Sequence, residues 1–245
     1  MAFGGARARP TASRPVDRRA AELGHVQAIA SALFFKAVLE SRRDDFSSTR
    51  LAVEPLLALT EEHNLKTYAD VGQVYANWAR GRQVDPESWA LGLRQALESY
   101  VGLGNKSGGP SFYGMLAELE AMIGGYDSAL MQIDQGLAMA DETEEHFTDP
   151  YLHRLRGECL LKREPGNSAP AVEAFQTSIA VAKQQGARSY ELLAALSLAK
   201  LYQSTSRAAE ACAVLRPALD GFSPTAEMPE IDEAQALLEA WAHGA

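Results

Sequence analysis

The glycine-rich stretch "VGLGNKSGGPSF", residues 101–112, contains the residue types that form phosphate-binding loops, because four glycines surround a Lys-Ser pair. A P-loop, GxxxxGK followed by Ser or Thr, connects a strand to a helix, so that backbone N–H groups surround the phosphates. Here lysine does not directly follow a glycine, no glycine stands five residues before Gly104, and the preceding residues have a helical pattern. The stretch is therefore predicted to join two helices, with Gly102 or Gly104 left-handed at the helix end and Pro110 in the next first turn.

A second group of candidate ligands is the acidic stretch "DETEEHFTDPYLH", residues 141–153, which combines several carboxylates with two imidazoles. Oxygen and nitrogen ligands in close succession suit a metal ion. The spacing, however, fits neither HExxH nor an EF-hand loop. Acidic and hydroxyl residues also cap helices, and Thr148 or Asp149 before Pro150 fits that role. We expect a helix cap here, and neither a metal ion nor another cofactor.

Residues for nucleophilic catalysis are scattered along the chain. His25, His63 and His243 read as surface residues, and no pattern brings any of them to a serine or an acid. Cys159 and Cys212 each lie in an apolar helical pattern without CxxC spacing, which is typical of buried free thiols in a reducing cytosol. The sequence therefore predicts a protein that is not an enzyme.

Composition and charge narrow the function further. The chain has 245 residues, of which 47% are hydrophobic and 22% charged, as in soluble globular proteins. The sequence has no apolar run long enough to span a membrane and no secretory signal, which favours a cytoplasmic protein. The net charge is −9; residues 1–20 contribute +4 and the remainder −13. We expect a flexible basic tail over residues 1–20 and no binding of nucleic acid, because the acidic body repels phosphates.

From about residue 20 onward, apolar residues recur at helical spacing, and turn signals interrupt the pattern at short intervals. The segments between them have roughly 15–20 residues, an ordinary helix length. This pattern predicts about eleven consecutive helices and an all-α protein, and such a series of similar helices is typical of internal repeats.

The clearest repeat spans residues 198–218. It has small residues at Ala199 and Ala211, where two helices of a hairpin would cross closely, and large residues at Tyr202 and Leu215 beside them. This alternation is the pattern of the tetratricopeptide repeat (TPR). The same register recurs upstream in Ala117, Ala129, Ile133 and Gly136, and in Gly157, Leu160, Ala171, Phe175 and Ser178.

The repeat period is longer than that of a compact TPR. Ala129, Ala171 and Ala211 are 42 and 40 residues apart, and Trp89 lies 40 residues before Ala129, against 34 residues for the compact repeat. Glu120 departs from the pattern, because a large apolar residue is expected at its position. We therefore expect helices or turns that are a few residues longer than usual.

The predicted fold is a right-handed superhelical solenoid of about five TPR-like helical hairpins with a C-terminal capping helix, over residues 21–245. Pro55 and Pro217 fall inside predicted second helices, where we expect a bend, or a helix that begins close to Pro55. The hairpins are expected at about residues 22–62, 66–103, 110–140, 149–185 and 188–222, and the cap at 229–243.

Several phrases, among them "RRDDFSSTRLAVEPLLALTEEHNL", "LHRLRGECLL" and "AFQTSIAVAKQQGARSYELLAALSLAKLYQ", resemble the C-terminal TPR region of bacterial adenylate or guanylate cyclase–ATPase proteins and related transcriptional regulators. The resemblance covers about residues 20–240. The P-loop of that ATPase and the metal-binding aspartates of that cyclase have no counterpart here. The resemblance therefore implies a regulatory arm without the catalytic domains, of a kind that binds proteins or peptides or holds an ATPase inactive until a ligand arrives.

The first helices of stacked hairpins line a concave groove. We expect a protein or peptide to bind there, in a bacterial signalling scaffold. The alternative is a small-molecule sensor that controls a separate ATPase, cyclase or transcription factor. Exposed array ends could also pair two chains. The expected groove residues are Glu118, Met122, Arg154, Glu158, Lys162, Lys200 and Gln203, with Tyr75, Trp78 and Arg80 in a looser register.

Overall fold

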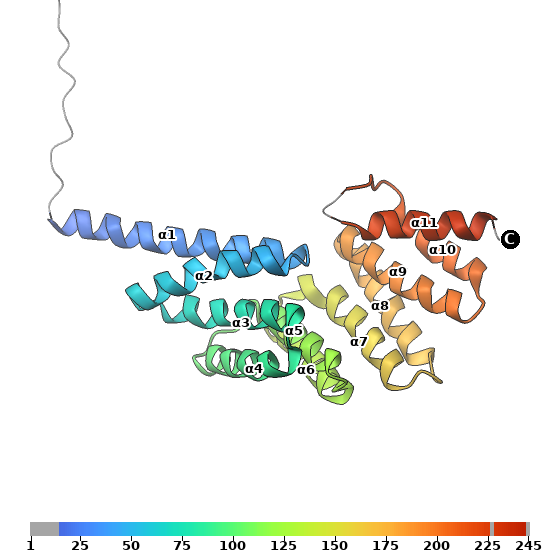
Figure 1. The fold of residues 1–245 in the computed structure, drawn as a ribbon, viewed down its shortest axis with the longest axis horizontal. Coiled ribbons are helices and arrows are strands. Elements are labelled where there is room, and N and C mark those ends of the chain that lie inside the picture. The colour runs from blue at the N-terminus through green and yellow to red at the C-terminus, as the bar shows by residue number, and fades with distance from the viewer. Residues whose placement is uncertain (1–14, 226–227, 244–245) are drawn as a thin grey trace, which may run out of the picture.

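The computed structural model describes residues 15–225 and 228–243, with side chains for residues 24–225 and 228–241. This part of the chain consists of helices and turns, without a strand (Figure 1). None of its helices is long and apolar enough to cross a membrane. The helices are α1 (Pro15–Arg42), α2 (Phe46–His63), α3 (Lys66–Gln83), α4 (Pro86–Gly102), α5 (Gly109–Met122), α6 (Tyr126–Thr143), α7 (Asp149–Arg163), α8 (Ala169–Gln185), α9 (Arg188–Ser204), α10 (Ala208–Leu219) and α11 (Glu230–His243), with a short 3-10 turn η1 (His146–Thr148) before α7.

Consecutive helices pack in pairs along the chain: α1 with α2, α3 with α4, α5 with α6, α7 with α8, and α9 with α10. The last helix, α11, packs on α10 and α9 and covers the end of the array. The predicted all-α solenoid of five hairpins with a capping helix is therefore confirmed. The odd-numbered helices also contact one another from pair to pair, from α1 to α9. An array curves toward the helices that touch, so these five helices line its concave face.

The small residues of the repeat lie where the two helices of a pair approach most closely. Ala129, Ala171 and Ala211 are fully buried. A Cβ added to Gly157 of α7 would lie 2.5 Å from the buried ring of Phe175 in α8. Any larger side chain at these positions would push the helices apart, so the sequence pattern marks the contacts that fix each crossing.

Helix ends follow local chemistry. Asp45 accepts a hydrogen bond from the backbone N–H of Ser48, and Asp85 accepts one from that of Glu87, so both act as N-caps. Asn64 after α2 and Gly186 after α8 are left-handed, with φ of 54° and 66°, and end their helices.

The glycine-rich stretch joins α4 to α5, as predicted. Gly104, with φ of 82°, is the left-handed residue at the end of α4, and Pro110 lies in the first turn of α5. The loop is held in place: the Tyr100 hydroxyl donates to the Ser107 carbonyl (2.8 Å), and Lys106 pairs with Glu142 of α6. Its lysine therefore has a structural partner.

Some expectations need correction. Residues 15–20 of the expected basic tail form the first turns of α1, and residues 1–14 lie outside the described part. Pro55 lies inside α2, which begins at Phe46, so the helix start expected near Pro55 is wrong. Glu120, at an apolar position of the repeat, is buried and pairs with Arg94 of α4, which explains how a carboxylate is accepted there.

The close approach at Gly157 can be tested by Gly157→Ala. Although alanine favours helix, we expect this variant to lose about 1–3 kcal/mol of unfolding free energy, because Phe175 must move. The control is Gly24→Ala in α1, where no atom lies within 4 Å of the added Cβ, and a gain of up to about 1 kcal/mol is expected. Urea denaturation followed by circular dichroism measures both. Equal stabilisation by the two changes would contradict the close crossing.

Candidate functional site

Two adjoining pockets lie on the concave face, and we call them together the groove. The larger, the charged pocket, has a volume of about 170 Å³, and the smaller, the aromatic pocket, about 70 Å³. They share Asp44, Glu118 and Arg154. The charged pocket is otherwise lined by Arg82, Ala121, Met122, Leu155, Glu158, Cys159 and Lys162, and the aromatic pocket by Ser41, Arg42, Trp78, Ser111, Met115, Tyr151, Tyr190 and Leu193.

Helix periodicity positions the charged side chains. Arg154, Glu158 and Lys162 are four residues apart on α7 and therefore form one stripe, about 12 Å long, along the groove. Glu118 and Met122 form the matching stripe on α5. Figure 1 shows α7 between α5 and α9, and residues of all three helices line the two pockets.

Glu118 is the buried acid of the groove, with only 8% of its surface exposed. The indole N–H of Trp78 donates to its Oε2 at 2.7 Å, and an Arg82 guanidinium nitrogen lies 3.5 Å from the same oxygen. Burial raises the pKa of the Glu118 carboxyl, and the neighbouring Arg82 opposes that shift. The side chain is thus held in place by a hydrogen bond and an ion pair in a site that disfavours its charge.

The charged pocket has three cations and three anions, and four of them form pairs. Arg82 pairs with Glu118, and Arg154 pairs with Glu158 at 2.5 Å. The Ser197 hydroxyl of α9 also donates to Glu158, at 3.3 Å. Asp44 and Lys162 form no ion pair with any residue in the described ranges, so the groove presents one free carboxylate and one free ammonium.

The turn between α1 and α2 reaches the groove from the first hairpin. Arg42 donates hydrogen bonds to the hydroxyls of Tyr190 on α9 and Ser111 on α5, the latter at 3.3 Å. Its guanidinium also stands over the rings of Phe147 in η1 and Tyr190, 5.3 and 5.9 Å from their centres. The first hairpin thus contacts the fifth, and Figure 1 shows the end of α1 directed toward α7 and α9.

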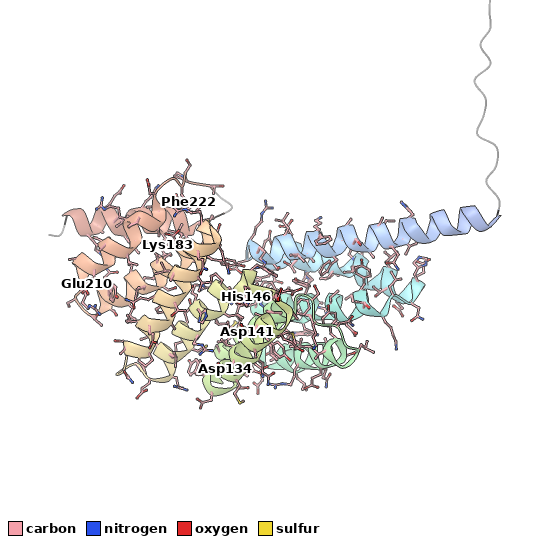
Figure 2. The ribbon with its side chains drawn as sticks, turned by 180° about the vertical axis from the view of Figure 1, so that it is seen from behind. Asp134, Asp141, His146, Lys183, Glu210 and Phe222 are labelled. Carbon is pink, nitrogen blue, oxygen red and sulfur yellow. The ribbon has the colours of Figure 1, made fainter. Side chains whose placement is uncertain are left out.

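The cysteine and histidines of this region are not arranged as a reactive set. Burial raises the pKa of Cys159 to about 12, so its thiol is protonated at neutral pH. His146 Nδ1 lies 2.8 Å from Asp149, and His146, labelled in Figure 2, belongs to η1 between α6 and α7. No group of three or more potential metal ligands gathers within the described residues.

The cap expected in the acidic stretch forms differently. Thr148 precedes α7 but makes no capping bond with its side chain, and its buried hydroxyl has no hydrogen-bond partner among the residues that the structure describes. Asp149 is instead the acid of the first helical turn, next to Pro150.

Five of the ten predicted groove residues come together in the charged pocket. They are Glu118, Met122, Arg154, Glu158 and Lys162.

The other five lie elsewhere or are buried. Trp78 lines the aromatic pocket but is only 2% exposed, because it packs on Phe46 and donates to Glu118. Tyr75 is 4% exposed and lies in the core between the rings of Phe34 and Phe112, so its expected exposure is wrong.

Three further predicted residues line neither pocket. Arg80 stands over the Trp89 ring of α4, 5.0 Å from its centre. Lys200 pairs with Glu233 of the capping helix at 2.7 Å, and Gln203 is exposed near the end of α9.

Six residues that line the two pockets were not predicted from the sequence. They are Arg42, Asp44, Arg82, Ser111, Tyr151 and Tyr190. Arg82 lies four residues after the predicted Trp78 and therefore on the same face of α3, so helix periodicity counted from Trp78 predicts it. Arg42 and Asp44 occur in "RRDD", which signals only a turn.

Comparison with known proteins supports the fold. The sequence matches no protein-family model, and no relative is found among curated proteins. Two crystal structures of a putative kinesin light chain with nearly identical TPR-like repeats from Podospora anserina are similar, each at 14% identity. One covers 88% of this chain and 96% of its own with a TM-score of 0.54, and the other 84% and 94% with 0.52.

A third similar structure is a signal transduction ATPase with numerous domains, with a tetratricopeptide repeat sensor, from Pyrococcus horikoshii. It is 12% identical, with a TM-score of 0.52 over 88% of this chain and 37% of that protein. At such identities the likeness concerns the fold alone, which is a TPR-like array of helical repeats.

The buried carboxyl can be tested by Glu118→Gln, which keeps an oxygen for the Trp78 indole but removes the charge. Because the folded pKa of Glu118 is raised, the wild type has its full stability below the pKa of an unfolded glutamate, about 4.3, and loses part of it as pH rises through the folded value. The unfolding free energy of the variant minus that of the wild type should therefore increase from about pH 4 to pH 7. A difference that stays constant or falls over this range, in urea denaturation at each pH, would show that the carboxyl is not disfavoured by burial.

Proposed function

We propose that this chain is a non-catalytic TPR-like scaffold that binds a protein or peptide segment in the groove of its concave face. The observation that supports it best is the pair of free charges, Asp44 and Lys162, among otherwise paired side chains. Two unpaired groups of opposite sign are available to a ligand without breaking an existing ion pair.

The shape of the groove favours an extended segment. Two small pockets that share a wall can each hold one side chain of an extended segment. Alternate residues of a strand point to the same side and are about 7 Å apart. Met122, 47% exposed, offers an adaptable apolar contact at the edge of the charged pocket.

The biological setting of the proposal is a regulatory arm in bacterial signalling, in the cytoplasm. It rests on the resemblance of the sequence to the TPR regions of cyclase–ATPase and transcription-regulator proteins. The similar P. horikoshii protein is a signal transduction ATPase with a tetratricopeptide repeat sensor. By analogy, a partner bound in the groove would act on an ATPase, a cyclase or a transcription factor encoded separately.

A small polar effector is the second candidate. The charged pocket, of about 170 Å³, is smaller than a typical ligand cavity, but its six charged side chains would bind the polar groups of a small charged metabolite. A thermal-shift screen separates the two, because only a bound ligand raises the unfolding temperature. A metabolite that does so in the wild type but not in a groove variant would favour the sensor.

Pairing of two chains through the array ends is a further proposal. Phe35 and Leu39, on α1 at the first end, are both exposed. Light scattering of the purified chain would distinguish a dimer from a monomer.

The peptide-binding proposal is tested by selecting peptides from a random display library against the wild type and measuring their affinity for two variants. Lys162→Glu reverses the free cation of the groove, whereas Arg216→Glu makes a like change on the exposed surface of α10, outside both pockets. We expect Lys162→Glu to weaken binding about tenfold or more and Arg216→Glu to change it little.

Two results would contradict this proposal. One is a library without any binder to the wild type. The other is a set of binders that respond equally to the two charge reversals, since their site would then lie elsewhere.

A further inference from the structure

Arg42 belongs to the first hairpin but lies in a slot built by the later ones. The slot consists of the Tyr190 hydroxyl and ring on α9, the Ser111 hydroxyl on α5 and the Phe147 ring in η1. The free carboxylate of Asp44 lines the same aromatic pocket. The aromatic pocket is therefore partly filled by a side chain of the first hairpin.

The slot matches a guanidinium better than other groups. A guanidinium is planar, carries several N–H donors in a fixed fork and stacks on aromatic faces, whereas an ammonium is a compact charge without a flat face. In the slot, two hydroxyl oxygens can accept from the N–H donors, and two aromatic rings can stack on the flat face of the guanidinium. A carboxylate would instead meet two aromatic faces and the nearby Asp44.

Arg42 can leave the slot without disrupting the core. Its side chain is exposed at the last turn of α1, and it forms an ion pair with none of the carboxylates that the structure describes. Phe147 is itself 48% exposed, so the slot opens to solvent. Arg42 is held there by hydrogen bonds to neutral hydroxyls and by ring contacts. Another arginine could form each of these interactions in its place.

We propose that this slot is an arginine-binding subsite of the groove, occupied by Arg42 in the free chain, and that a partner segment enters the groove by presenting an arginine that displaces Arg42. The second half of the proposal rests on the proposed function, whereas the subsite itself does not. Displacement would also release the first hairpin from the fifth, so binding would be coupled to the opening of the array.

The test empties the slot with Arg42→Ala and titrates the full chain with N-acetyl-arginine amide, observed by nuclear magnetic resonance. We expect this probe to bind Arg42→Ala about tenfold more tightly than the wild type, since no internal occupant competes. N-acetyl-lysine amide should bind much more weakly than the arginine amide. Arg43→Ala, which removes the neighbouring arginine that pairs with Glu40, should behave as the wild type.

Two more variants keep the test decisive. Arg42→Lys retains the charge at the helix end and should also leave the slot open to the arginine amide. Adding Tyr190→Phe to Arg42→Ala keeps the ring but removes the hydroxyl. The double variant should bind the arginine amide severalfold more weakly than Arg42→Ala does. Equal binding of the arginine amide to the wild type and to both Arg42 variants, or no preference for arginine over lysine, would overturn the subsite.

Failure of the subsite and failure of the proposed function give different results. If the arginine amide binds Arg42→Ala as expected but the library yields no peptide, the arginine subsite is supported and the peptide-binding proposal is contradicted. If peptides bind but replacement of each arginine in them by lysine changes nothing, the displacement is wrong while peptide binding stands.

Discussion

The close crossing of paired helices at small residues is the constraint on which the rest of the structure depends. Ala129, Ala171 and Ala211 are fully buried at these crossings, and Gly157 leaves room for only the Phe175 ring. Helices that cross this closely have little freedom in their packing angle. Stacking of the five pairs gives the array its curvature, which turns α1, α3, α5, α7 and α9 toward one another.

That curvature creates the groove and closes part of it. It brings the α1–α2 turn, far away in the sequence, to α5, η1 and α9, where Arg42 meets Tyr190 and Ser111. It also gathers charged residues of four hairpins in the charged pocket, where four of the six are ion-paired. The two that are not, Asp44 and Lys162, come from the turn and from the last turn of α7. The groove therefore owes its free charges to the shape of the whole array.

Local features of the fold could be predicted from the sequence, and features that depend on curvature could not. Helix ends follow from nearby capping residues, glycines and prolines, and the second-helix anchors follow from the spacing of small residues. The α7 stripe of Arg154, Glu158 and Lys162 follows from helix periodicity once the register is known. Tyr75 was expected to be exposed, but its burial depends on Phe34 of α1, and the role of Arg42 depends on the fifth hairpin. Both contacts join residues that are far apart in the sequence, so no pattern of neighbouring residues predicts them.

The central claim is that the array curves until its first hairpin meets its fifth and encloses the groove. It is tested most directly by a pulsed electron spin resonance measurement of the distance between spin labels at Lys36→Cys on α1 and Ser189→Cys on α9, with Cys212→Ser as background. Both label positions are exposed, and Cys159 is buried. The account predicts one narrow distribution at the separation that the closed array gives. A broad distribution centred at longer distances would show that the two hairpins do not meet in solution.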